Sequence, residues 1–567
     1  MLDQLKHPIV WQGDDCFTHM LVVGPTRCGK TSTILKPMIY QLLFLKKKGV
    51  PLGLSVVEPK GDVARLVKEI CDAMEIPCTY IDPESPHSQK YNPMEGAIDD
   101  VAEATVVVLK GLFGKQEAFF ATVQELSARN VTKLLKTLRG DKIDIIDVMN
   151  TLRDPLELER QVKELKRRDG LTDLVHFFET ELLGTQKEKY RQFVIGLRAQ
   201  LENITSNHFL RRIMTGKSDI NMDEHFANGG VLAVNTSLGR LRQAGDAFGQ
   251  FVIMHLQNAT FRRPGTEKTR IPHFLIVDEY SRYINPDVEI FLSLAAEYRV
   301  AGVFATQSLG QLEVESGKIG AKAMKQSILT SCRNKIAFGG LSAADAKEFA
   351  EEFGKDIVIK RQKTYEHSLF IPHIFPKSFR DVEMEEYRYH FSQLMDGLKR
   401  FQFVYKGVKN GTPQPPVLGQ GRFIPNDWKE RRQWEEQKKT TFFMRVKKAV
   451  AELKPKYPRH WRWPDDEASE PYKIIDAEFT PIEETERPQV FNNPFATQTF
   501  GQTGEEKEAF WTFKPENGEN QPDKKPSDSP DRFPFEGGDA QKKEEEAQQT
   551  TSTVPHSHPE SHDGFWD

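Results

Sequence analysis

One segment near the start of the chain has the residue types and spacing of a phosphate-binding loop. The pattern GxxxxGK(S/T) is met by Gly24, Pro25, Thr26, Arg27, Cys28, Gly29, Lys30 and Thr31, and Ser32 follows directly. The glycines let consecutive backbone N–H groups face phosphate oxygens. The Lys30 ammonium would reach the β- and γ-phosphates, and the Thr31 hydroxyl would complete the coordination shell of a magnesium ion. Residues 24–32 therefore predict binding of ATP and Mg²⁺.

A second segment supplies the acidic groups that such a loop needs. The apolar run HFLIV at residues 273–277 ends in Asp278 and Glu279. Asp278 would hold Mg²⁺ together with Thr31, and Glu279 would orient and deprotonate the attacking water. The next apolar run ends at Gln307, whose amide could sense the γ-phosphate. The alternative for Gln307 is an ordinary hydrogen bond at the surface.

The elements that would position these residues alternate along the chain. Strand-like runs at residues 20–24, 52–57 and 78–82 are separated by helical patterns, which predicts a parallel sheet with crossover helices. Residues 101–214 instead have apolar residues at helical spacing throughout. Strand-like runs then resume at residues 231–235, 274–277, 302–305 and 336–338. The sequence thus predicts an α/β fold that surrounds an all-helical insertion.

Several segments, in this order, resemble those of the type IV secretion coupling proteins, the ATPases of bacterial conjugation. They are GPTRCGKTS at Gly24, VVEPKGD at Val56, YNP at Tyr91, LIVDEY at Leu275, ATQSLGQL at Ala305, and CRNKIAFGGLSAADAKEFAEEFG at Cys332. HFSQLMDGLKRFQFVYKG at His390, followed by PQPPVLGQ, also resembles the closing portion of that family's core. The resemblance spans roughly residues 20–422. It implies a RecA-like P-loop NTPase motor domain with an inserted all-α domain, and six copies in a ring around a DNA channel. It also implies DNA-stimulated ATP hydrolysis, non-specific DNA binding, and a relaxase and secretion-channel components as partners.

These patterns together predict five parts of the chain. The motor domain would comprise residues 1–100 and 216–425, with the all-α insertion at 101–215. A basic, tryptophan-containing helical extension would follow at 426–464, and a disordered acidic tail at 465–567.

The sequence departs from the family pattern at several positions. The family usually begins with two membrane-spanning helices, whereas about 19 residues precede the first strand here. We therefore expect a cytoplasmic protein, attached peripherally to the inner face of the membrane through partner proteins. The EPKGD segment has Glu58 and Asp62 where the family has DPKGE, which keeps both charges, and Arg27 and Cys28 leave the glycines of the loop intact.

An arginine that the family places eleven residues before the sensor glutamine falls on Ala296 in this chain. That arginine is thought to reach the γ-phosphate bound by a neighbouring subunit. Arg299 is our candidate for the role, and the alternatives are Arg240, Arg242 and Arg333. A trans-acting arginine raises phosphoryl-transfer rates by orders of magnitude, so its absence would mean weak hydrolysis.

Charge is distributed unevenly along the chain. Residues 465–567 contain 25 acidic and 9 basic side chains, so the remaining residues carry a net positive charge although the whole chain is at −4. A basic body suggests a polyanionic partner. The basic stretch with Trp428, Trp434, Trp461 and Trp463 could bind a single DNA strand, or it could be a helix whose tryptophans pack on the motor domain. The five cysteines include no CxxC pair and the histidines no HExxH, which disfavours zinc and disulfide frameworks.

The sequence as a whole predicts an ATP-driven coupling protein that links a relaxase–DNA substrate to a type IV secretion channel and translocates DNA. The alternative is a nucleotide-dependent receptor or scaffold that recruits protein substrates to the channel without pumping DNA. DNA-stimulated ATPase activity would separate the two.

Overall fold

The computed structural model describes residues 9, 11–112, 118–185, 187–315, 319–365 and 378–430. All of them belong to one compact unit, Met1–Glu483. The predicted acidic tail and all but the first five residues of the predicted basic extension lie outside the described residues.

Nine strands of the described residues form one sheet, in the order β13-β10-β7-β1-β6-β5-β2-β4-β3. Their bounds are β1 Met20–Val23, β2 Gly53–Glu58, β3 Cys78–Ile81, β4 Val231–Asn235, β5 His273–Val277, β6 Val300–Thr306, β7 Asn334–Phe338, β10 Gln402–Lys406 and β13 Val417–Gln420. The seven strands from β7 to β3 pair in parallel. β10 is antiparallel to β7, and β13 is antiparallel to β10. Every strand run predicted from the sequence is thus confirmed, whereas β10 and β13 were not predicted.

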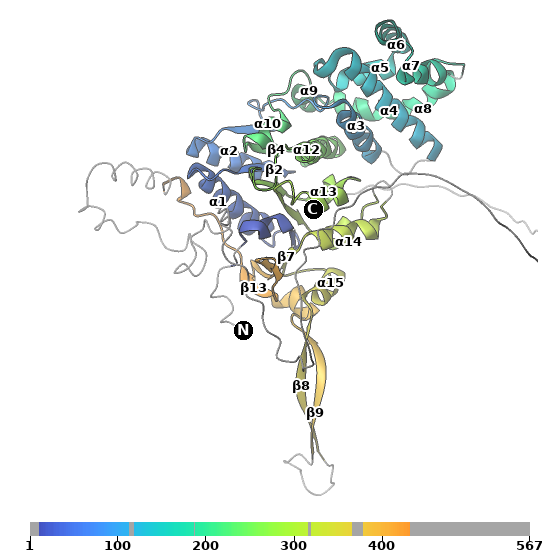
Figure 1. The fold of residues 1–567 in the computed structure, drawn as a ribbon. Coiled ribbons are helices and arrows are strands. Elements are labelled where there is room, and N and C mark those ends of the chain that lie inside the picture. Colours follow the sequence, from blue (N-terminus) through green and yellow to red (C-terminus); the bar gives the residue numbers. More distant parts are fainter. Residues whose placement is uncertain are drawn as a thin grey trace, which may run out of the picture. The chain divides into compact units, whose positions relative to one another are not determined.

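The parallel strands are buried on both faces, which explains why they read as continuous apolar runs rather than as alternating patterns. On one face, side chains such as Val22 and Val56 pack in a core with helices α1 (Lys36–Lys47) and α2 (Asp62–Met74). On the other face, Val23 and Val277 share a core with α12 (Gln243–Phe261), α13 (Val288–Leu294), α14 (Ala321–Ser331) and α15 (Ala343–Phe353). Figure 1 shows this three-layer arrangement, in which helices cover both faces of the sheet.

All regular elements that the structure describes between β3 and β4 are helices, joined by turns and loops. The α-helices are α3 (Ile98–Leu112), α4 (Ala118–Arg139), α5 (Ile145–Arg153), α6 (Pro155–Asp169), α7 (Asp173–Phe177), α8 (Lys187–Thr205), α9 (His208–Met214) and α10 (Met222–Ala227). The YNP segment connects the helical segment to α12, which covers one face of the sheet. The Tyr91 hydroxyl hydrogen bonds to His255 Nδ1 of α12 (2.8 Å), and Asn92 Nδ2 donates to the Ile143 carbonyl (2.7 Å) between α4 and α5. That this segment forms a separate all-α domain stays a prediction.

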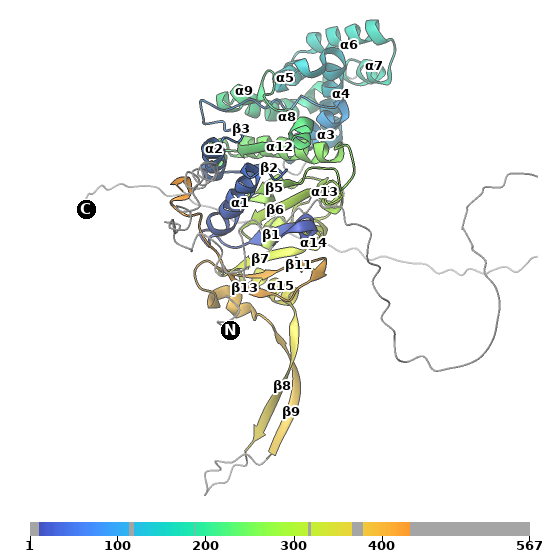
Figure 2. The same cartoon turned by 60° about the vertical axis from the view of Figure 1, so that its left-hand side comes forward.

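A two-stranded ribbon follows α15 and was not predicted. It consists of β8 (Lys355–Thr364) and β9 (Ser378–Tyr387), which pair in antiparallel register along their whole length. The ribbon extends away from the sheet in both views (Figures 1 and 2). The described residues also contain a short strand pair, β11 (Val408–Lys409) and β12 (Thr412–Pro413), the small helix α11 (Leu238–Leu241) and several 3-10 or π-helical turns.

Candidate nucleotide-binding site

The predicted phosphate-binding loop runs from the end of β1 into a continuous helix. Its last glycine, Gly29, has φ 115°, a conformation that side chains other than glycine's rarely adopt. At Gly24, a Cβ atom would come within 2.7 Å of both Cys28 Sγ and Phe338 Cβ. Glycine is therefore required for backbone conformation at one end of the loop and for space at the other. Helical structure begins at Lys30 with one π-helical turn, Lys30–Leu35, and continues as α1.

The Lys30 side chain folds back into the loop and is buried. Its ammonium donates to the carbonyl oxygens of Gly24 (2.5 Å) and Pro25 (3.5 Å). Of the remaining loop residues, Thr26 is exposed, Arg27 is exposed and has φ 66°, and the Ser32 hydroxyl donates to the Gly29 carbonyl. Lys30 is thus positioned where phosphate oxygens would meet the loop.

The two predicted magnesium ligands lie side by side, although 247 residues separate them in the sequence. The Thr31 hydroxyl donates to Asp278 Oδ2 at 2.8 Å. Asp278 is 3% exposed, and burial raises the pKa of its carboxyl while the bond from Thr31 lowers it. Mg²⁺ binds hard oxygen ligands, commonly one or two carboxylates completed by phosphates and waters, and this pair fits that donor set. No group of three or more His, Cys, Asp or Glu in the described residues could hold a metal ion.

Glu279 and Gln307 also meet, at the ends of neighbouring strands. Gln307 Nε2 donates to Glu279 Oε1 at 3.0 Å, and Gln307 Oε1 accepts from the Thr26 hydroxyl at 3.2 Å. Glu279 is largely buried and takes the left-handed conformation at φ 52°. The glutamine therefore connects the predicted proton acceptor to the predicted phosphate loop.

Two further charged residues belong to this site but were not assigned to it from the sequence. Glu58 ends β2, is fully buried, and accepts hydrogen bonds from the backbone N–H groups of Lys60 (2.7 Å) and Ala64 (3.2 Å). Burial raises the pKa of Glu58 to about 7, against the lowering effect of these two bonds. The Lys60 ammonium lies 4.0 Å from Glu279 Oε1. Both residues come from the VVEPKGD segment, so the signal was present in the motif.

Comparisons with known proteins identify the family. Residues 4–371 match the family model described as type IV secretory system conjugative DNA transfer. The chain belongs to this family. The search of curated proteins finds no match. No helix of the described residues has the length and apolarity needed to span a membrane.

Solved structures of the plasmid coupling protein TrwB share the fold. The unbound form of TrwBdeltaN70 has 14% sequence identity and a TM-score of 0.52, covering 72% of this chain and 86% of that one. TrwB in complex with ADP and Mg²⁺ has 14% identity and a TM-score of 0.52 over 75% and 92% of the two chains. TrwB with the ATP analogue ADPNP gives 14% and 0.50 over 74% and 91%.

The structure does not bring Arg299 to the site of this conjugative DNA-transfer protein. Arg299 precedes β6, at the edge of the sheet opposite the loop, and is 9% exposed. Its guanidinium pairs with Asp14 (2.6 Å) and stacks on the Phe17 ring (4.1 Å). Arg333 likewise precedes a strand, β7, whereas Arg240 and Arg242 follow the carboxyl end of β4. Arg240 is 57% exposed and 3.6 Å from Glu84.

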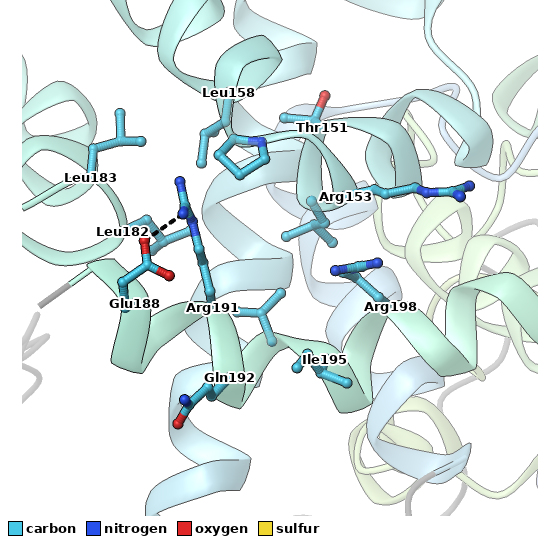
Figure 3. Close-up of a pocket in the computed structure, with 13 residues that line it drawn as sticks. Thr151, Arg153, Leu158, Leu182, Leu183, Glu188, Arg191, Gln192, Ile195 and Arg198 are labelled. Atoms are coloured by element: carbon cyan, nitrogen blue, oxygen red, sulfur yellow. Dashed lines mark hydrogen bonds and ion pairs between the residues drawn. The ribbon is translucent and has the colours of Figure 1, made fainter.

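A separate cavity of about 240 Å³ lies within the helical segment, away from the loop. Its apolar lining includes Leu158, Leu182 and Ile195, and Arg191 and Arg198 contribute from α8 (Figure 3). Arg191 pairs with Glu188 at 2.6 Å. The volume is below the roughly 300–1,000 Å³ of pockets that enclose whole small ligands. The cavity is therefore too small to enclose a whole small ligand.

Proposed function

We propose that this chain is a P-loop ATPase that couples a relaxase–DNA substrate to a type IV secretion channel and translocates the DNA. Family membership supports the conjugative role. The observation that carries the ATPase role is the convergence of Lys30, Thr31, Asp278, Glu279 and Gln307 at one edge of the sheet. TrwB, which shares the fold, has been seen with ADP and Mg²⁺ and with ADPNP.

In this proposal ATP occupies residues 24–32, with its phosphates against the loop and the Lys30 ammonium. Mg²⁺ held by Thr31 and Asp278 would neutralise charge on the phosphate oxygens. Glu279 positions a water in line with the γ-phosphorus and accepts its proton as the P–O bond to the leaving ADP breaks. Because Gln307 hydrogen bonds to Glu279, it is placed to respond when the γ-phosphate leaves.

A chain of contacts leads from Gln307 toward the other end of the fold. Gln311 Oε1 accepts from Gln307 N (3.2 Å) and from the Thr306 hydroxyl (3.0 Å). Leu309 N then donates to the buried Asp345 of α15 at 3.2 Å, and α15 leads into the β8–β9 ribbon. A change at Gln307 would therefore be transmitted through the QSLGQL segment to α15, which we propose as the route from hydrolysis to movement of DNA.

We further propose that the working form is a cytoplasmic homo-hexamer that reaches the membrane through partner proteins. A trans-acting arginine must be exposed in one subunit, so Arg240 fits the role better than the buried, ion-paired Arg299. The helical segment would contact the relaxase complex, and its arginine-bordered apolar cavity is a suitable contact for an acidic, apolar segment. Trp428 packs edge-on against Tyr40 of α1. For this tryptophan the contact supports packing on the motor domain over binding of a DNA strand.

The test is ATP turnover with and without single- and double-stranded DNA, with the Lys30→Ala chain as control. We expect turnover that DNA raises and that Lys30→Ala abolishes. Turnover insensitive to both DNAs would favour the receptor alternative. No ATP binding at millimolar concentration would refute the ATPase.

A further inference from the structure

Two segments from the end of the described chain reach the edge of the sheet where the phosphate loop lies. β10 is antiparallel to β7, so its first residue lies beside the carboxyl end of β7. β13 is antiparallel to β10 and ends beside that residue, because Gln420 pairs with Gln402. Residues 399–401 before β10 and 421–423 after β13 are therefore at the edge where ligands of parallel α/β sheets bind.

Both segments pack directly on the phosphate loop. A Cβ atom at Gly29 would lie 2.6 Å from Cδ1 of the Phe401 ring. A Cβ atom at Gly421 would lie 2.2 Å from Oγ1 of Thr33, whose hydroxyl donates to the Gly29 carbonyl at 2.8 Å. Gly421 N also donates to the Phe401 carbonyl at 2.8 Å. Phe401 thus packs on Gly29, while Gly421, which hydrogen bonds to Phe401, packs on Thr33 one turn further on.

Phe401 is the centre of an aromatic and cationic cluster. The exposed Phe423 ring contacts it edge-on, with ring centroids 5.1 Å apart, and the Arg400 guanidinium lies 4.6 Å from its centroid. Phe401 has φ 65°, which is rare for a bulky residue. Such strain persists only where surrounding contacts impose it, and it concentrates at functional sites.

We propose that Arg400, Phe401 and Phe423 form the contact surface for the base of the bound nucleotide. The inference rests on the proposed ATP binding. With the phosphates along Gly24–Thr31, the base would lie beyond Gly29, beside this cluster. Phe401 positions the cluster against the loop, whereas Phe423, with 54% of its surface exposed, and Arg400 offer the accessible faces. Aromatic rings and guanidinium groups stack on any base, so this surface would bind ATP and GTP alike.

The experiment compares ATP, GTP and inorganic tripolyphosphate, each with Mg²⁺, as ligands of the full chain. Phe423→Ala removes an exposed ring and should leave folding intact. Phe379→Ala is the matched control, since Phe379 is 58% exposed and its ring faces the Arg361 guanidinium on the β8–β9 ribbon. We expect Phe423→Ala to weaken ATP and GTP about tenfold and tripolyphosphate less than twofold. Arg400→Ala should act in the same direction, and Phe379→Ala should change nothing.

A second measurement does not depend on tripolyphosphate affinity. In a Phe423→Trp chain, stacking of a base should change the indole fluorescence on addition of ATP, relative to the wild-type chain titrated in parallel. Unchanged ATP affinity in Phe423→Ala, equal loss of ATP and tripolyphosphate, or no fluorescence change would each overturn the base contact while leaving ATP binding intact. Failure of the wild-type chain to bind ATP at all would instead refute the proposed function and this contact with it.

Discussion

Exchange of Glu279 for glutamine separates hydrolysis from binding. Glu279→Gln keeps the shape of the side chain, so the hydrogen bond from Gln307 Nε2 at 3.0 Å can persist to the remaining oxygen. The left-handed backbone at position 279 costs the two residues about the same, so stability should be nearly unchanged. What is lost is the proton acceptor.

General-base catalysis contributes roughly 10²–10⁴ in rate, which corresponds to about 3–5 kcal/mol of activation free energy. We therefore expect the kcat of ATP hydrolysis to fall by about that factor. The dissociation constant of ATP should stay within about twofold or tighten, because the exchange removes a negative charge close to the phosphates.

The assay is phosphate release at saturating ATP and Mg²⁺, combined with equilibrium binding of ATP. The Lys30→Ala chain is the reference for loss of ATP binding. Glu386→Gln is the matched control, because Glu386 pairs with Lys360 at 2.7 Å on the ribbon, as Glu279 faces Lys60 at the site. A fall in kcat of less than about fivefold would show that another group takes the proton. A loss of ATP affinity as large as that of Lys30→Ala would show that Glu279 supports the loop instead.

Three other perturbations test separate features. Burial raises the pKa of the Cys28 thiol, so its alkylation should be slow and faster at high pH, and complete modification should abolish ATP binding; retained affinity would refute this. Burial raises the pKa of Glu58 to about 7 in the folded chain, against 4.5 for the free side chain. As pH rises, the unfolded chain therefore loses this proton before the folded chain does. The free energy of unfolding should fall between pH 4.5 and 7, by about 3 kcal/mol at most. Denaturant titrations at pH 5 and pH 8 should show that loss in the wild-type chain but not in Glu58→Gln, and a pH-independent difference between the two would contradict the assignment. Deleting the acidic residues 465–567 should raise DNA affinity if they compete with DNA for the basic body, and an unchanged affinity and salt slope would argue against that competition.

The core of the site could be predicted from the sequence because its signals are local. Residues 24–32 contain their own glycines, lysine and threonine, and residues 273–279 combine a buried strand with two carboxylates. Parallel strands place their carboxyl ends at one edge, so the meeting of Thr31 and Asp278 follows once both runs are recognised as neighbouring strands of one sheet. The same reasoning would have placed Glu58, which ends β2, in the site.

Arg299 shows where local signals end. It was a candidate because it lies three residues after Ala296, where the family has its arginine. Seven residues of β6 separate Arg299 from Gln307, however, and a strand of that length carries its two ends to opposite edges of the sheet. The contacts of Arg299 with Asp14 and Phe17 involve residues about 285 positions away, which no spacing rule within the motif could reveal. Whether it acts in trans stays a prediction.

The aromatic cluster was beyond sequence reasoning for a related reason. Phe401 lies in the HFSQLMDGLKRFQFVYKG segment, whose resemblance to the family's core assigns no role to this residue. It reaches Gly29 only because β10 and β13 add to the sheet in antiparallel register and reverse the chain twice beside β7. A shift of one residue in that register would turn Phe403 and Tyr405 away from the core that they share with Phe338, so the buried side chains of β10 fix where Phe401 must lie. The position of the proposed base contact thus follows from the packing of β10 and β13 on the sheet, and not from any residue spacing that a motif search would detect.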